Sequence, residues 1–218
     1  QKGASVSLSE SQAHYVNQVL RLKPNHTLRV FHATSGEYEA VIHAVYKKGC
    51  ELRIGEQTRA PKLSPDFWLC FAPVKGGRTE TIIEKATELG ARVIQPVLTK
   101  RCIVDKVNID RAYAIAREAA EQCERTDWPE IREPVKLLKL LGDWPQDVPL
   151  IYGDESGESA SINSLLFREG GEPPFAAAPL TPSLRGSAEP THRTLSTPSN
   201  WAILAGPEGG FTPEEFAA

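Results

Sequence analysis

The sequence predicts an α/β protein in which a small barrel-like β domain precedes a parallel α/β domain. Three observations lead to this prediction. Short runs of alternating apolar and polar residues fill positions 27–55, strands and helices alternate from residue 67 onwards, and the proline-flanked segment 61–65 has the composition of a linker. We therefore expect one domain over residues 1–64 and a second over residues 65–218.

The first domain is expected to open with a helix and to continue in three strands. Ser9 and Gln12 have the spacing of a capping box, and Lys23-Pro24-Asn25 ends the pattern. The apolar positions of this helix are Ala13, Val16, Val19 and Leu20. The strands are predicted at 27–32, 38–46 and 50–55, separated by the turn signals Ser35-Gly36 and Lys48-Gly49.

The second domain is expected to begin with a buried strand at 67–72. The helix that follows, at 81–89, has Thr81 as its predicted cap, Ile82, Ala86 and Leu89 on one face, and Gly90 at its end. Further strands are predicted at 93–97, 148–152 and 201–205, and a long helix at 109–124. Because strands and helices alternate, we expect the sheet to be parallel.

Residues 156–200 differ in composition from the rest of the second domain. They are rich in Ser, Pro, Gly and Ala and include Pro173-Pro174. A segment of this kind buries too little apolar surface to offset the entropy of ordering it. We expect a disordered or loosely ordered insertion, to which the sequence assigns no role.

The most informative stretch is the last one. The apolar run 201–205 leads into Gly206-Pro207-Glu208-Gly209-Gly210-Phe211, and Thr212 can cap a helix that begins at Pro213, with Glu215 at the capping-box position. Glycines leave backbone N–H and C=O groups bare, so the loop suits the edge of a nucleoside, although a plain turn has the same signature. Its spacing matches neither the dinucleotide fingerprint nor the P-loop.

Charge is distributed unevenly along the chain, whose net charge is −3. Residues 1–64 carry nine Lys or Arg against five Asp or Glu, while residues 65–218 carry sixteen against twenty-three. A basic first domain favours a polyanionic partner, and a solvated charged surface is the alternative.

The four cysteines and five histidines are scattered, without a C-x-x-C pair or metal-ligand spacing. We therefore expect no metal site and no disulfide framework, and free thiols suit a reducing cytoplasm. Apolar runs of membrane-spanning length are also missing from the sequence, so no membrane association is expected.

Four segments are recognisable by their order and spacing. They are 14–22 (HYVNQVLRL), 84–90 (EKATELG), 118–125 (EAAEQCER) and 206–211 (GPEGGF). Together they resemble the RsmE family, the SPOUT-superfamily methyltransferases that make N3-methyluridine in small-subunit ribosomal RNA. One such segment is weak evidence, whereas four in the right order are specific.

The resemblance implies a PUA-like RNA-binding β domain followed by a SPOUT-type knotted parallel α/β domain. It also implies S-adenosylmethionine as cofactor, 16S ribosomal RNA in the small subunit as substrate, and a homodimer. Family members usually begin with an Arg-bearing strand and, after the helix starting at Thr212, add a final strand, a second glycine loop and a last helix. Because neither segment is found between Gln1 and Ala218, we expect part of the knot and of the RNA-binding face to lie outside this sequence.

Two groups of binding residues follow from the resemblance. The adenosine is expected to lie against the glycine loop and a neighbouring strand end. The loop residues are Leu204, Ala205, Gly206, Glu208, Gly209 and Gly210, and the strand-end residues are Pro96, Val97 and Leu98. For the strand-end residues, an ordinary turn is an equally good explanation. The expected phosphate contacts are Arg21, Lys23, Arg29, Lys75 and Arg78. Each of these side chains could equally be a solvated surface cation that contacts no phosphate.

Catalysis is assigned to Glu121, Gln122 and Arg125, which lie within about one helical turn. Glu121 is predicted to accept the uracil imide proton, or Arg125 to steady charge on the uracil oxygens. On the predicted helix Glu121 and Arg125 share a face at i and i+4, so an ordinary helix salt bridge explains the pair equally well.

Two other functions are compatible with the sequence. One is a SPOUT methyltransferase with a different RNA target or base nitrogen, and the other is a catalytically silent RNA-binding module. A nucleotide-phosphate-binding α/β protein is disfavoured, because no Lys-Ser or Lys-Thr follows the glycines.

Overall fold

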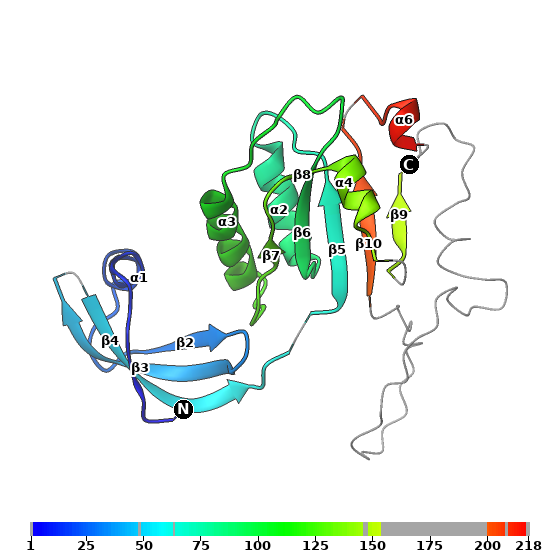
Figure 1. Cartoon of the computed structure of the whole chain (residues 1–218). Helices are drawn as coiled ribbons and strands as arrows, with labels where there is room; N and C mark the ends of the chain where they lie inside the picture. The colour runs from blue at the N-terminus through cyan, green and yellow to red at the C-terminus, as the bar shows by residue number, and fades with distance from the viewer. Residues whose placement is uncertain are drawn as a thin grey trace, which may run out of the picture. The chain divides into compact units, whose positions relative to one another are not determined.

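The computed structural model describes residues 2–47, 49–62, 64–145, 148–153, 200–207 and 209–216 (Figure 1). The predicted insertion lies outside the described residues except for its last residue, 200. The chain divides into two compact units, Gln1–Leu63 with Ala120–Trp128, and Ser64–Ala119 with Pro129–Ala218. Residues 120–128, which the sequence analysis placed in the second domain, therefore cluster with the first.

The first unit contains an antiparallel four-stranded sheet of order β1-β4-β3-β2. Its strands are β1 (Ser5–Ser7), β2 (Thr27–His32), β3 (Gly36–Tyr46) and β4 (Gly49–Arg59). The three predicted strands are confirmed, and β3 and β4 are longer than expected. β1 was not predicted, because a strand of three residues is too short to show an alternating pattern. Closure of this sheet into a barrel stays a prediction.

A short helix covers one face of this sheet. It comprises α1 (Glu10–His14) and the π-helical turn η1 (Tyr15–Val19), and it begins with the predicted capping box of Ser9 and Gln12. Ala13 and Val16 are buried together with Ala40, Ile42 and Leu52 of the strands. The capping box and the burial of Ala13 and Val16 agree with the prediction, whereas Val19 and Leu20, expected on the same apolar face, are 58% and 45% exposed.

The second unit is built on a parallel sheet of order β7-β6-β5-β10-β9, with β8 also paired to β6. The strands are β5 (Asp66–Phe71), β6 (Val93–Leu98), β7 (Glu130–Ile131), β8 (Val135–Lys136), β9 (Leu150–Tyr152) and β10 (Asn200–Ala205). The predicted parallel α/β arrangement is thus confirmed.

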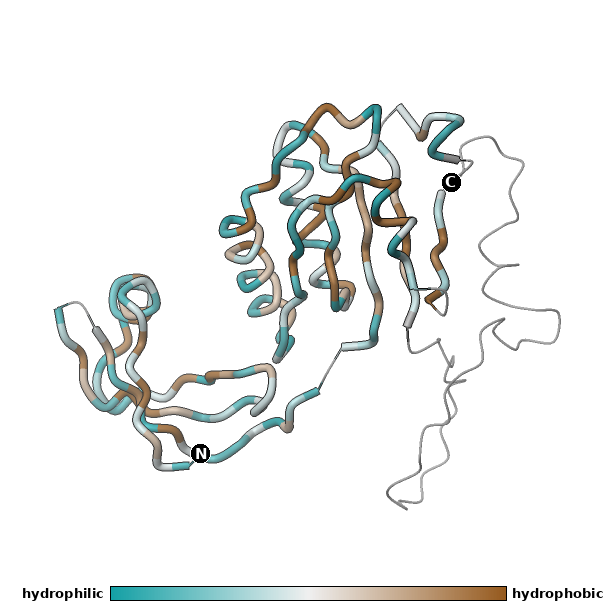
Figure 2. The backbone as a smooth tube through the Cα atoms, in the orientation of Figure 1, coloured by the Kyte–Doolittle hydropathy of each residue, from teal (hydrophilic) through white to brown (hydrophobic). Residues whose placement is uncertain are grey.

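Helices lie on both faces of the parallel sheet (Figure 1). On one face α2 (Arg78–Glu88) and α3 (Ile109–Gln122) bury Ile83 and Ala116 against Phe71 and Ile94. On the other, α4 (Leu137–Gly142) buries Leu137 in a second cluster. Figure 2 shows hydrophobic stretches along these strands and in α4. The short helix α6 (Pro213–Phe216) follows β10 and its loop.

Two helix boundaries differ from the prediction. The helix expected from residue 81 begins at Arg78, because Gly77 takes a left-handed conformation (φ 78°) and is the N-cap in place of Thr81. Leu89, expected on the buried face, is 82% exposed. The helix expected to reach residue 124 ends at Gln122, since Glu124 has a φ of 55°.

β7, β8 and α4 were not predicted either. Strands of two residues are too short to show an alternating pattern. Within the described residues, no helix combines the length and the apolar character that crossing a bilayer requires.

Candidate cofactor and substrate site

The carboxyl ends of β6, β5 and β10 meet at one edge of the parallel sheet. These strands are neighbours in the order β6-β5-β10 and run in the same direction, so Leu98, Phe71 and Ala205 end at the same side. Ala72 N–H donates to the Ala205 carbonyl at 3.0 Å just beyond the last strand pair. In open α/β sheets the loops at this edge are where ligands bind.

The glycine loop after β10 is folded tightly on itself. A Cβ built on Gly206 would lie 2.9 Å from the ring of Phe211, so no larger residue fits there while Phe211 stays in place. Phe211 is buried with Leu204 and Val97, which anchors the far end of the loop in the core. Gly210 has a φ of 68°, the left-handed region that favours glycine.

Gly209 has more space around it than Gly206. A Cβ added at Gly209 would lie 3.6 Å from Arg101 Cδ, which is an ordinary contact distance. The Arg101 guanidinium donates a hydrogen bond to the Gly209 carbonyl. Arg101 follows β6, so the loops after β6 and β10 are in direct contact at the candidate site.

Glu215 provides a second link between these two loops. Its carboxylate accepts hydrogen bonds from the backbone N–H of Lys100 at 2.7 Å and of Thr212 at 2.8 Å. Burial raises the pKa of Glu215, but the backbone donors outweigh it and hold the pKa below the usual glutamate value. The predicted capping-box contact of Glu215 to Thr212 is present, and its contact with Lys100 was not foreseen.

The predicted cofactor residues of both strands lie at this edge. Pro96 and Val97 are fully buried at the end of β6, and Leu98 is half-buried. Leu204 is buried, whereas Ala205 and Gly209 are exposed. Glu208 lies outside the described residues. These positions are compatible with a ligand lying across the strand ends, and their binding role stays a prediction.

The catalytic candidates lie at and beyond the C-terminal end of α3. This end is a Schellman motif, in which Arg125 N–H donates to the Ala120 carbonyl at 2.9 Å and Glu124 N–H to the Glu121 carbonyl at 3.3 Å. Glu121 and Gln122 are exposed in the last helical turn. Arg125 lies outside the helix, so the expectation that it shares a helix face with Glu121 is wrong.

Arg125 instead pairs with Asp127. Its Nε donates to Asp127 Oδ1 at 3.2 Å, and the two side chains are only 11% and 12% exposed. Thr126 between them is also buried. Asp127 was not among the predicted residues, and its place two residues after Arg125 is the signal in the sequence that could have indicated the pair. The catalytic candidates belong to the first unit and the cofactor candidates to the second.

The five predicted phosphate contacts also divide between the units. The first unit contains Arg21, Lys23 and Arg29, and the second contains Lys75 and Arg78. Lys75 lies in the loop that precedes α2, and Arg78 is the first residue of that helix. Arg29 is 59% exposed yet reaches Glu37 at 3.8 Å and Glu124 at 3.5 Å. Part of its charge is therefore engaged within the protein.

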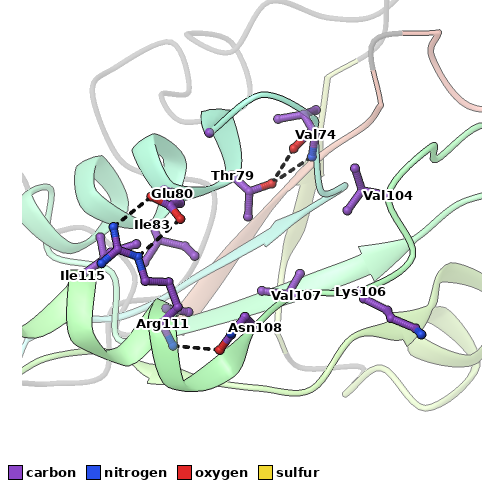
Figure 3. Close-up of a pocket in the computed structure, with 12 residues that line it drawn as sticks. Val74, Thr79, Glu80, Ile83, Val104, Lys106, Val107, Asn108, Arg111 and Ile115 are labelled. Atoms are coloured by element: carbon purple, nitrogen blue, oxygen red, sulfur yellow. Dashed lines mark hydrogen bonds and ion pairs between the residues drawn. The ribbon is translucent and has the colours of Figure 1, made fainter.

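A pocket of about 180 Å³ lies between the first turns of α2 and α3 (Figure 3). The Arg111 side chain crosses the pocket to Glu80, with a nitrogen–oxygen distance of 3.3 Å. Asn108 Oδ1 accepts a hydrogen bond from the backbone N–H of Arg111 at 3.0 Å. Thr79 closes another side through hydrogen bonds to the backbone of Val74. None of the predicted cofactor residues lines this pocket, which is therefore distinct from the candidate site.

The chain is similar in sequence to known RNA methyltransferases. Residues 61–218 match the family model of the RNA methyltransferase domain. A Rickettsia conorii protein, ribosomal RNA small subunit methyltransferase E, is 31% identical over 208 residues, covering 95% of this chain and 74% of the relative. The Bacillus subtilis protein of the same name is 24% identical, covering 99% of this chain and 78% of the relative.

Solved structures agree with this match in fold. A Legionella pneumophila protein with bound S-adenosylmethionine has a TM-score of 0.75 and 28% identity, covering all of this chain and 80% of that one. Ribosomal RNA small subunit methyltransferase E from Neisseria gonorrhoeae has a TM-score of 0.75 at 23% identity, with the same coverage.

The parallel sheet and the loops at its carboxyl edge, together with the family match, define an RNA methyltransferase. More particularly, the chain belongs to the family of ribosomal RNA small subunit methyltransferase E, the RsmE family named above. The family prediction made from four short segments is therefore confirmed.

Proposed function

We propose that this protein transfers the methyl group of S-adenosylmethionine to N3 of a specific uridine in 16S ribosomal RNA of the small subunit. The observation that carries the proposal is the glycine loop at the carboxyl edge of β10, in a chain of the RsmE family. The Legionella relative holds S-adenosylmethionine, which supports the same cofactor here.

The residues at the strand ends fit such a cofactor. Gly209 and Gly210 have no side chain to block a flat adenosine, and Ala205 at the end of β10 is exposed. Glu215 and Arg101 tie this loop to the one after β6, so both walls of the site are fixed to each other. A preorganised site of this kind spends little binding energy on ordering itself.

The bound cofactor would supply an electrophilic methyl group, and the protein must supply position and a proton acceptor. Methyl transfer is an in-line displacement, so alignment of the two reactants is the main catalytic contribution. N3 of a paired uridine is inaccessible, so the base must be unpaired or flipped out. We assign Glu121, Gln122 and Arg125 to holding the uracil edge and accepting its proton.

The remaining family features are part of the same proposal. We assign RNA binding to the basic first unit as a PUA-like domain, a SPOUT-type knot to the second, and a homodimer in the cytoplasm to the assembly. Their support is family membership and the positive charge of residues 1–64.

Two measurements on the full-length protein test the proposal. Calorimetry should show binding of S-adenosylmethionine, and labelled methyl groups should be transferred to small subunits that lack the modification. Digestion of the product RNA should yield N3-methyluridine. Methyl label on another nucleoside would favour a different SPOUT specificity, and RNA binding without any transfer would favour the silent module.

A further inference from the structure

A buried carboxylate in the first unit organises a small polar network. Glu37 of β3 has a side chain only 5% exposed, and it accepts hydrogen bonds from Arg59 Nη2 at 2.5 Å and Thr58 Oγ1 at 2.7 Å. The Arg59 hydrogen bond holds the pKa of Glu37 below its usual value against the effect of burial. Glu37 is therefore a charged anchor for the Arg59 guanidinium.

The other end of the Arg59 guanidinium reaches the chain beyond α3. Arg59 Nη1 donates to the backbone carbonyl of Glu124 at 2.9 Å, across 65 positions of sequence. Glu124 is the left-handed residue of the Schellman motif, and its side chain lies 3.5 Å from Arg29 Nη2. Both the main chain and the side chain of Glu124 are thus held by arginines from the β sheet.

Stability alone is a weak explanation for this arrangement. Burying a carboxylate costs free energy that its ion pair barely offsets, so an apolar pair of similar size would serve stability as well. The left-handed conformation at Glu124 is itself unfavourable for a residue with a Cβ. Unlike an apolar pair, Glu37 and Arg59 form directional hydrogen bonds. Because Nη2 of the planar Arg59 guanidinium is bound to Glu37, its Nη1 is held in one place and fixes the position of the Glu124 carbonyl.

The residues around Glu124 are those to which we assign the chemistry. Glu121 and Gln122 precede it in the last turn of α3, and Arg125 follows it directly. A shift of the Glu124 carbonyl would therefore move the groups on either side of it.

We propose that Arg59, anchored by Glu37, is a positioning residue for methyl transfer, holding the turn that carries Glu121, Gln122 and Arg125. The inference rests on the proposed function, since it needs these residues to meet the substrate. Arg59 itself acts through the Glu124 carbonyl. Misplacement of a reacting group by about 1 Å can cost about 100-fold in rate, so loss of Arg59 is expected to lower kcat much more than it weakens cofactor binding.

The test compares Arg59→Ala, Arg59→Lys and Glu37→Gln with Arg111→Ala in the full-length protein. Arg111 is a matched control, because it also pairs with a glutamate, Glu80, but at the surface and near the opposite end of α3. Methyl transfer is measured at a temperature well below each melting point, with S-adenosylmethionine affinity and amide hydrogen exchange measured alongside.

We expect Arg59→Ala to lower kcat by about tenfold or more, with an unchanged cofactor Kd and faster exchange of the Arg125 amide. Arg59→Lys and Glu37→Gln, which keep size or shape, should fall between wild type and Arg59→Ala, while Arg111→Ala should behave as wild type. A normal kcat in folded Arg59→Ala overturns the positioning role. If Arg59→Ala does not fold, a normal kcat and normal Arg125 exchange in Glu37→Gln overturn it instead.

Failure of the two proposals can be told apart. Wild-type protein that transfers no methyl group rejects the proposed function, and with it the positioning role that depends on it. Normal wild-type transfer with normal transfer by the variants rejects the positioning role alone.

Discussion

The carboxylate of Glu215 accepts a hydrogen bond of 2.7 Å from the backbone N–H of Lys100, 115 positions earlier in the chain. The same carboxylate caps α6 through Thr212. One buried side chain therefore joins the loop after β6 to the segment after β10, the two segments expected to flank the cofactor.

Replacing Glu215 with Ala should destabilise the second unit by about 1 to 3 kcal/mol, because two backbone donors lose a charged acceptor. The pKa of Glu215 is lowered in the folded state, so its stabilising effect is present at neutral pH and is lost as pH falls through and below about 4. Urea denaturation at pH 7 and at about pH 3 measures both effects.

Glu214→Gln is the matched control for this change. The neighbouring carboxylate pairs with the Lys100 side chain but is 74% exposed, so its removal should hardly alter stability. If Glu214→Gln and Glu215→Ala lowered the free energy of unfolding equally, the stabilising role assigned to the Glu215 carboxylate would be contradicted.

Gly206 and Gly209 should respond differently to substitution. Gly206→Ala forces Phe211 out of its place, since the new Cβ would lie 2.9 Å from the ring, and should lower the melting temperature. The Cβ of Gly209→Val would meet only an ordinary 3.6 Å contact with Arg101, so we expect the fold to survive while S-adenosylmethionine binding is lost. A thermal melt and calorimetry on both variants separate the two effects. Unchanged cofactor affinity in Gly209→Val would reduce the loop to a plain turn.

Binding of small-subunit RNA should weaken as salt rises, and mutation should show which unit makes the phosphate contacts. The contacts of Phe31 with Trp128 and of Arg59 with Glu124 mean that residues 1–64 alone would lack part of their packing, so the test belongs in the whole protein. Lys23→Ala should reduce the slope of log K against log salt by about 1 if that lysine meets a phosphate.

Lys75→Ala applies the same measurement to the second unit, and Lys85→Ala is a control whose ammonium is already paired with Glu84 and Glu88. A reduced slope in Lys75→Ala alone would move the RNA contacts away from the first unit. Slopes equal to wild type in both variants would leave these lysines as solvated surface.

Local signals explain how much of the fold the sequence could predict. The capping box of Ser9 and Gln12 and the alternation along β3 lie within a few residues, so both could be read directly. The end of α3 could not, because Glu124 takes a left-handed conformation with neither glycine nor asparagine to mark it.

The parts of the site that were missed depend on distant partners. Arg59 and Glu37 come from adjacent strands whose register shifts at bulges, and neither residue has a motif of its own. Glu215 was identified as a cap because Thr212 is three residues away, whereas its contact with Lys100 needs the folded sheet. Hydrogen bonds between residues so far apart in the sequence depend on the tertiary structure, so local sequence patterns do not predict them.

Arg125→Ala should affect both stability and turnover, and the structure changes what to expect of the first. As a surface helix pair Arg125 would contribute about 0.3 to 0.5 kcal/mol, but its pairing with Asp127 is nearly buried, with side chains 11% and 12% exposed. Breaking a nearly buried ion pair by removing one partner is strongly destabilising, so we expect a loss of about 3 kcal/mol and a clear fall in melting temperature.

The catalytic part of the prediction therefore needs a variant with the same structural loss. Asp127→Ala breaks the same pair while keeping the guanidinium. If Arg125 steadies charge on the uracil, Arg125→Ala should lose about 100-fold in turnover of the folded protein, by analogy with removal of an oxyanion donor, and Asp127→Ala should lose much less. Transfer of labelled methyl groups, measured well below both melting temperatures, makes the comparison. Equal turnover in the two variants would assign Arg125 to structure, and would leave Glu121 and Gln122 as the remaining candidates for contact with the base.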